Sequence, residues 1–277
     1  MNKLPLILLL LLSITCFSQK KDKIKGSKIV TTETRKIENF SGLEVADNIE
    51  VVLKKGLNCG LEIEADDNLH EAIDITLSGS TLKLSTTKNI TSAKKLTINL
   101  TYKEDFNNIN LLDESSVISL TDFELTQITI NATNSSKLFL NAKVENFKLL
   151  MDEKAKGELN LKSQNATITL SKNSELKALI ASVDLTFDMY QKTDAIIEGD
   201  VDNLKLRLDN NADFVGNNLT TKNAEVLAES YSKASIQIKN NATIEALGKS
   251  ELEIYGDGAI NLKRFTDNAI LKKKTIK

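Results

Sequence analysis

A repeat of about nineteen residues runs from roughly Asn108 towards the C-terminus and strongly limits the folds open to this chain. Each unit contains a strand with alternating apolar residues, a short polar turn built on a small residue, and a second short strand. The turn residues align as Ser116, Ser136, Ala155, Ser174, Thr193, Ala212, Ser232 and Ser250. Units with so regular a period indicate a stacked array and argue against a globular α/β enzyme.

The strands within the repeat alternate strictly between apolar and polar residues, as in Leu204 to Leu208. Because successive side chains of a strand point to opposite sides, this alternation places the apolar face inward and the polar face in water. The side chains expected to point inward include Ile130, Leu161, Leu206 and Ile238. We therefore predict an all-β fold, a right-handed parallel β-helix or β-solenoid with about eight coils of roughly 19 residues. An antiparallel β-sandwich is the alternative, because it shares the alternation but not the fixed period.

The N-terminus has the pattern of an export signal. A basic start at Lys3 precedes the apolar run Leu4 to Ile14, and Cys16-Phe17-Ser18 offers small residues for cleavage after Ser18. The run is shorter than the roughly 20 residues that span a bilayer. We therefore predict a signal peptide at residues 1–18 and no transmembrane segment. A lipoprotein anchored through Cys16 is the alternative, although the residues before it fit that motif less well.

Charge and repeat together divide the remaining chain. Residues 19–36 are rich in lysine and are expected to form a basic linker. Residues 37–262 are expected to form one solenoid domain, with irregular N-terminal strands at 37–107 and the regular repeats at 108–262. Residues 263–277 carry a second cluster of lysines and are expected to form a basic C-terminal tail.

Composition excludes several classes of function. The formal net charge is −2, tryptophan is absent and other aromatic residues are few, which argues against nucleic-acid binding. Beyond the signal peptide the chain has one cysteine, Cys59, so it cannot form an internal disulfide. That cysteine and the single histidine, His70, could in principle form a catalytic pair, but a lone cysteine is more often a small apolar residue. No cofactor is expected.

The segment before the repeats contains a recognisable signature. Phe40-Ser41-Gly42-Leu43 begins it, Val45, Ile49 and Val51 follow at strand spacing, and Gly56 ends it. This pattern resembles the opening of the putative auto-transporter adhesin head GIN domain family. The resemblance covers about Lys36 to Ile260 and implies an exported, Bacteroidetes-type β-solenoid. The turns depart from the family, because they contain Ser, Asn and Lys where Gly-Ser-Gly is usual.

Acidic residues recur near the turns and raise the question of an enzyme. They are Asp113, Glu114, Asp152, Glu153, Asp209 and Asp213. A carbohydrate-active β-helix enzyme, either a lyase or a glycosidase, would need carboxylates gathered in a groove. These acids drift in register, and the glycine-rich calcium-binding nonapeptide is absent. We therefore expect a non-enzymatic envelope or cell-surface protein, and leave open whether the acidic turns bind a cation.

The outward residues of the strands are the best candidates for a binding surface. Lys205 and Arg207 alternate on one strand, and Lys148, Thr167 and Thr169 occupy similar places in earlier repeats. In a solenoid such residues would stand about 4.8 Å apart from coil to coil. This ladder suits an extended polymer, such as an envelope or extracellular polysaccharide, or the surface of another protein, better than a small molecule.

Overall fold

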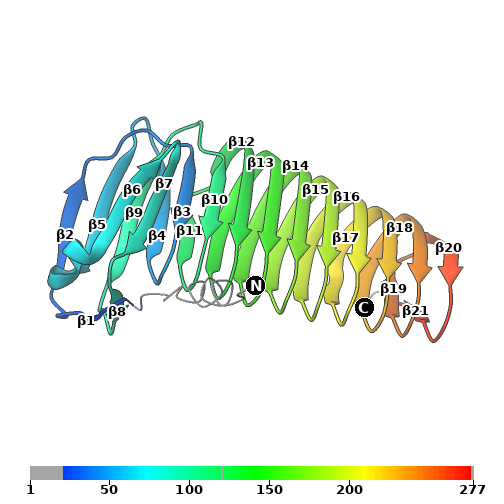
Figure 1. Cartoon of the computed structure of the whole chain (residues 1–277). Helices are drawn as coiled ribbons and strands as arrows, with labels where there is room; N and C mark the ends of the chain where they lie inside the picture. The colour runs from blue at the N-terminus through cyan, green and yellow to red at the C-terminus, as the bar shows by residue number, and fades with distance from the viewer. Residues whose placement is uncertain (1–20, 120, 276–277) are drawn as a thin grey trace, which may run out of the picture.

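The chain folds into one long stack of β-strands. The computed structural model describes residues 21–119 and 121–275, and these are nearly all β. They form a β-solenoid of about 9 turns, elongated along the axis on which the coils stack (Figure 1). Successive coils pair in parallel, and the antiparallel sandwich is not supported.

Each regular coil is one long strand that bends at its middle. The strands are β12 (Phe123–Ala132), β13 (Lys137–Met151), β14 (Lys156–Leu170), β15 (Glu175–Met189), β16 (Asp194–Leu208), β17 (Asp213–Ala228) and β18 (Lys233–Ala246). We expected two separate strands in each repeat. In β13 the alternation slips at Glu145 and Asn146, which are both exposed, but the pairing with β14 resumes at Asn146. The bend therefore leaves the strand assignment unbroken.

The bend divides every coil into two arms and gives the solenoid two faces. The first-arm face is built from residues that follow the tight turn, such as 137–143 and 156–162. The second-arm face is built from residues that precede the next turn, such as 147–151 and 166–170. Inward residues of both arms form one continuous apolar core, in which Ile130, Leu161, Leu206 and Ile238 are buried as predicted.

The tight turns repeat a left-handed backbone position. It lies two residues before the small buried residue of each coil, as at Asn134 before Ser136 and Glu153 before Ala155. The positions with positive φ that precede such a residue are Asp113, Asn134, Glu153, Lys172, Gln191, Asn210, Ser230 and Gly248. A small side chain is needed after the turn because the chain folds sharply back over the core.

The first turn corrects our alignment by one residue. Ser115 is fully buried, whereas the predicted Ser116 begins the strand β11 (Ser116–Ser119). Ser116 pairs with Lys137, so Ser115 stands in register with Ser136. The double serine made the two positions indistinguishable by residue type alone.

The N-terminal part extends both faces of the solenoid with parallel strands and ends the stack with antiparallel strands. The strands β3 (Gly42–Val45), β4 (Glu50–Lys55) and β10 (Asn108–Leu111) form the first coils with β11. Next come β7 (Thr81–Thr86) and β9 (Leu96–Tyr102), which pair in parallel with β3 and β4. Antiparallel strands complete the end, namely β2 (Val30–Arg35), β5 (Gly60–Asp66) and β6 (Ile73–Ser78). We call this antiparallel end, with the 3₁₀ helix η2 (Asp67–Ala72), the N-terminal cap.

Half of the segment expected to be a basic linker, residues 19–36, is β-strand in the structure. Within it, β2 pairs with β5, and β1 (Lys23–Lys25) pairs with β8 (Asn89–Thr91). Threonines make β2 a good edge strand, and lysine side chains remain in solvent while the backbone pairs. Charge alone therefore did not distinguish an exposed strand from a linker. The signal peptide predicted at 1–18 lies outside the described residues.

The predicted C-terminal tail is also strand for much of its described length. The last strands are β19 (Glu251–Tyr255), β20 (Ala259–Phe265) and β21 (Ile270–Lys274). Here β20 pairs with β18, and β21 pairs with β19, so the solenoid continues beyond residue 262. Lys272 and Lys274 reach back to Glu251 and Glu253 of the preceding coil. The lysine run is compatible with a strand because its charges face solvent and neighbouring acids.

Candidate functional site

The predicted binding residues occupy two adjacent rows on the second-arm face. Lys148, Thr167 and Lys205 belong to one row, in register through the intervening Thr186. Thr169 and Arg207 belong to the next row. Between them lies Asp188, which the sequence analysis did not select. The structure thus places all five predicted residues on one surface, along the solenoid axis.

Arg207 is the centre of a small polar cluster on this face. Its guanidinium lies over the ring of Tyr190, 5.5 Å from the centroid, and its Nη2 is 3.6 Å from a carboxylate oxygen of Glu229. Burial raises the pKa of the Asp188 carboxyl, and the positive charges of Arg207 and Lys205 only partly oppose this effect. Asp188, Tyr190, Lys205 and Arg207 border a shallow depression of about 490 Å³.

Tyr190 shares the environment of Asp188. Burial raises the pKa of the Tyr190 hydroxyl, and the negative charge of Asp188 adds to the rise. Both groups therefore favour their neutral forms more than the free side chains do. A sequence signal for this cluster was present in the alternation Asp188-x-Tyr190 at the end of β15, but its meaning depends on the coil register, which places it beside Arg207.

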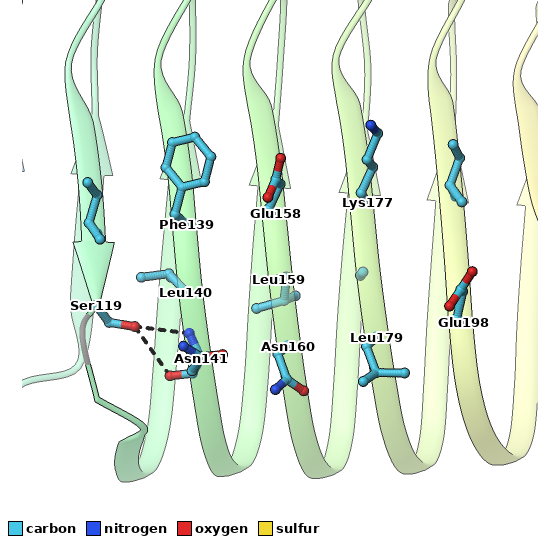
Figure 2. Close-up of a pocket in the computed structure, with 13 residues that line it drawn as sticks. Ser119, Phe139, Leu140, Asn141, Glu158, Leu159, Asn160, Lys177, Leu179 and Glu198 are labelled. Atoms are coloured by element: carbon cyan, nitrogen blue, oxygen red, sulfur yellow. Dashed lines mark hydrogen bonds between the residues drawn. The ribbon is translucent and has the colours of Figure 1, made fainter.

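The opposite, first-arm face carries a longer groove that sequence reasoning missed. It has a volume of about 640 Å³ and crosses several coils (Figure 2). One row of outward residues consists of Ile118, Phe139, Glu158, Lys177 and Ile196 in register. A parallel row consists of Asn141, Asn160, Leu179 and Glu198. We call these two rows the first-arm groove.

Apolar side chains are unusually exposed in the first-arm groove. Phe139 is 38% exposed, Leu179 is 52% exposed and Ile196 is 43% exposed. Glu158 and Lys177 form no ion pair or side-chain hydrogen bond with other residues of the described chain. Figure 2 shows Phe139, Glu158 and Lys177 side by side, one from each successive coil. Exposed apolar groups beside uncommitted polar groups are typical of a surface that contacts a ligand.

Three of the acidic turn residues, Asp113, Asp152 and Asp209, have local partners. Asp152 accepts from the Ser171 hydroxyl at 2.6 Å and from the Lys172 ammonium at 2.9 Å. Burial tends to raise the pKa of Asp152, but these bonds and the backbone N–H of Glu153 hold it below its usual value. Asp209 similarly accepts from the Ser230 hydroxyl at 2.6 Å. Within residues 21–119 and 121–275, no group of three or more His, Cys, Asp or Glu is placed to hold a metal ion.

Cys59 is not among the interaction partners of His70 in the structure. His70 lies in η2, where its Nε2 is 2.9 Å from the hydroxyl of Thr31 and its Nδ1 is 3.2 Å from a carboxylate oxygen of Glu33. Arg35 donates to the backbone carbonyl of the same histidine at 2.7 Å. These contacts join η2 to β2, so the histidine helps to hold the N-terminal cap.

Comparisons with known proteins agree with this architecture. The family model described as "Putative auto-transporter adhesin, head GIN domain" matches residues 39–178 and 148–258. The chain belongs to this family. Among curated proteins, no sequence matched. In the described residues, no helix has the length and apolar character needed to cross a membrane.

Solved structures share the fold at low sequence identity. A putative adhesin from Parabacteroides merdae aligns with a TM-score of 0.68 at 15% identity, covering 92% of this chain and 98% of its own. A putative adhesin from Parabacteroides distasonis gives 0.64 at 15% identity, with coverages of 91% and 100%. A putative lipid binding protein from the same species gives 0.62 at 16% identity, with coverages of 92% and 100%. At these identities the likeness concerns the fold alone.

The family signature has a structural explanation in this GIN-domain protein. Phe40, Val45, Ile49 and Val51 are buried in the core of the first coil. Gly42 approaches the side chain of Thr81 on the neighbouring strand, where an added Cβ would lie 3.0 Å from its hydroxyl oxygen. Gly56 is more restricted, since a Cβ there would lie 2.4 Å from a methyl of Thr101. The signature therefore marks how the first coil packs against β7 and β9.

Proposed function

We propose that this GIN-domain protein is exported and attaches to an envelope or extracellular polymer, or to a surface protein, without catalysing a reaction. Membership of an adhesin-type family supports a surface role. The observation that carries the proposal is the double row of hydroxyl, amine and guanidinium groups on the second-arm face. Repeated weak contacts with a repetitive ligand add up through multivalency.

The second-arm face suits attachment that depends on salt. Lys148 and Lys205 are amines in one row, and Arg207 adds a planar donor in the next. Exposed charges act over about 10 Å at 0.1 M salt and over about 3 Å at 1 M, so their contribution should fall as salt rises. The half-buried Asp188 carboxyl beside them can accept hydrogen bonds from hydroxyl or amide groups of a ligand.

A binding assay with the exported chain tests this role. Immobilised whole-envelope polysaccharide and surface-protein fractions would be offered to the protein and to Lys205→Ala/Arg207→Ala. We expect the double variant to bind about tenfold more weakly, with less salt dependence. Lys143→Ala/Lys162→Ala removes the same charge from the first-arm face and should bind normally. Equal binding by all three proteins, or cleavage of a polysaccharide by the purified protein, would contradict the proposal.

Export has its own test. Mass spectrometry of the protein from its native cells should give a mature N-terminus at Gln19. A lipid-modified N-terminus at Cys16 would support the anchored alternative, and an intact leader in the cytosol would contradict export.

A further inference from the structure

We propose that the first-arm groove is a second binding site, specific for a neutral, extended, β-linked polysaccharide that lies along the solenoid axis. This site is on the face opposite the Lys205 and Arg207 rows and does not depend on the function proposed for them. The proposal rests on the shape of the groove, its mixture of apolar and polar groups, and its balance of charge.

The groove is straight and crosses several coils, so its shape suits a linear ligand. Its rows cross the coils from Ile118 to Ile196 and from Asn141 to Glu198, as Figure 2 shows for most of these residues. Five coils at about 4.8 Å spacing give a straight track of about 19 Å. A β-linked pyranose chain is an extended ribbon whose rings follow one another at a spacing close to that of the coils. Successive rings can therefore meet successive coils.

The groove offers what the two sides of a sugar ring require. The apolar C–H face of a pyranose packs on exposed apolar groups, and Phe139, Leu179 and Ile196 provide them. The hydroxyl groups at the ring edge need donors and acceptors. Asn141 and Asn160 supply amides in one row, and Glu158 and Lys177 supply a carboxylate and an amine in the other. Both kinds of group repeat along the same track.

The charge of the groove disfavours an anionic polymer. Glu158 and Glu198 carry two negative charges and Lys177 carries one positive charge, so the track has a small negative excess. An acidic polysaccharide would bring its carboxylates against these groups. An acyl chain would remove Glu158 and Lys177 from water without giving them a partner, which costs free energy.

The closed backbone ladder disfavours a peptide strand. Backbone groups of β13, β14 and β15 bond to the coils on either side, so no strand edge opens along the groove. A peptide that binds by strand addition needs such an edge. A ligand on this face must bind through side chains, as a glycan can.

Isothermal titration calorimetry with cellohexaose and mannohexaose tests the assignment on the full exported chain. We expect at least one to bind, with similar affinity at about 0.1 M and about 1 M salt, since charge is not the main attraction. Phe139→Ala should bind about tenfold more weakly, and Phe139→Trp should retain affinity because it keeps an aromatic surface. Phe265→Ala removes a similarly exposed ring from β20, outside the groove, and should bind as the wild type does.

Four results would overturn the proposal. They are no heat from either oligosaccharide, unchanged affinity in Phe139→Ala, stronger binding of polygalacturonate or phosphatidylcholine vesicles than of the oligosaccharides by Lys205→Ala/Arg207→Ala, and a self-association in sedimentation velocity that Phe139→Ala abolishes. Asn160→Ala, a fully outward substitution, gives a second variant with an expected loss of affinity. Lys205→Ala/Arg207→Ala should leave cellohexaose and mannohexaose binding unchanged, which separates failure here from failure of the second-arm proposal.

Discussion

The regular coils and the N-terminal cap belong to the same solenoid but are stabilised by different interactions. In the coils each residue pairs with its equivalent one repeat away, so one pattern is satisfied many times. In the cap the strands turn antiparallel, and single polar residues make contacts that occur once. The comparison teaches that stability in the coils is distributed, whereas stability in the cap depends on a few buried polar groups.

Asp66 illustrates the difference. It is fully buried at the end of β5, and its carboxylate accepts from the backbone N–H groups of Lys28, Lys94 and Lys95 at 2.9 to 3.2 Å. These bonds join three separate segments of the chain. No residue in the regular coils has an equivalent role, since the buried polar residues there are the serines and threonines of the turns together with Ser182 and Thr221.

The largest expected effect is a charge placed inside a regular coil. Leu206→Asp would bury a carboxylate beside Phe187 and Val226, its neighbours in register, and we expect a loss of several kcal/mol in the free energy of unfolding. Urea denaturation followed by circular dichroism measures it. Lys205→Asp places the same charge on the exposed neighbour and should change stability much less. A small effect of Leu206→Asp would contradict the assigned core register.

Removal of the cap carboxylate should come next in size. Asp66→Ala leaves three partly buried N–H groups without their acceptor, and we expect a loss of about 3 kcal/mol. Hydrogen exchange should rise first in β2, β5 and the segment around Lys94, and less in β14 and β15. An equal rise along the whole solenoid would show that the cap does not unfold as a separate unit.

The pH dependence of stability sharpens the same point. Burial tends to raise the pKa of Asp66, but the N–H groups of Lys28, Lys94 and Lys95, with the charge of Lys28, hold it below its ordinary 3.8. A lowered pKa in the folded state means that the stabilisation is present above pH 3.8 and is lost as the pH falls through the folded-state value. The Asp66→Asn variant should lose less stability over that acidic range. Parallel pH profiles for wild type and variant would exclude this role of Asp66.

The smallest expected effect lies at a turn. Glu153 has a φ of 59°, a left-handed position that asparagine adopts more readily than glutamate. Glu153→Asn should therefore stabilise the protein by about 0.5 kcal/mol, visible as a small rise in the urea midpoint. Asn134→Glu is the reverse exchange at the equivalent position of the previous coil and should destabilise by a similar amount. Effects of the opposite sign would contradict the strain assigned to these turns.

The sequence by itself determined the solenoid, its period and its inward face. A stacked repeat can be recognised from the sequence because every coil must have the same alternation and the same turn. Leu161 and Leu206, for example, are inward residues of different coils. The predicted position of the first turn was wrong by one residue, because the adjacent Ser115 and Ser116 fit the sequence pattern equally well.

Only the tertiary structure decided the cap and the sites. The antiparallel pairing of β2 with β5 joins segments about thirty residues apart, and no sequence repeat predicts it. The strand β1 was not predicted because its lysines made the segment resemble a linker. The face of Lys205 and Arg207 could be predicted from alternation, but their neighbours Asp188 and Tyr190 required the coil register. The first-arm groove arises because Phe139, Lys177 and Ile196, each unremarkable in its own repeat, are stacked into one row by parallel pairing.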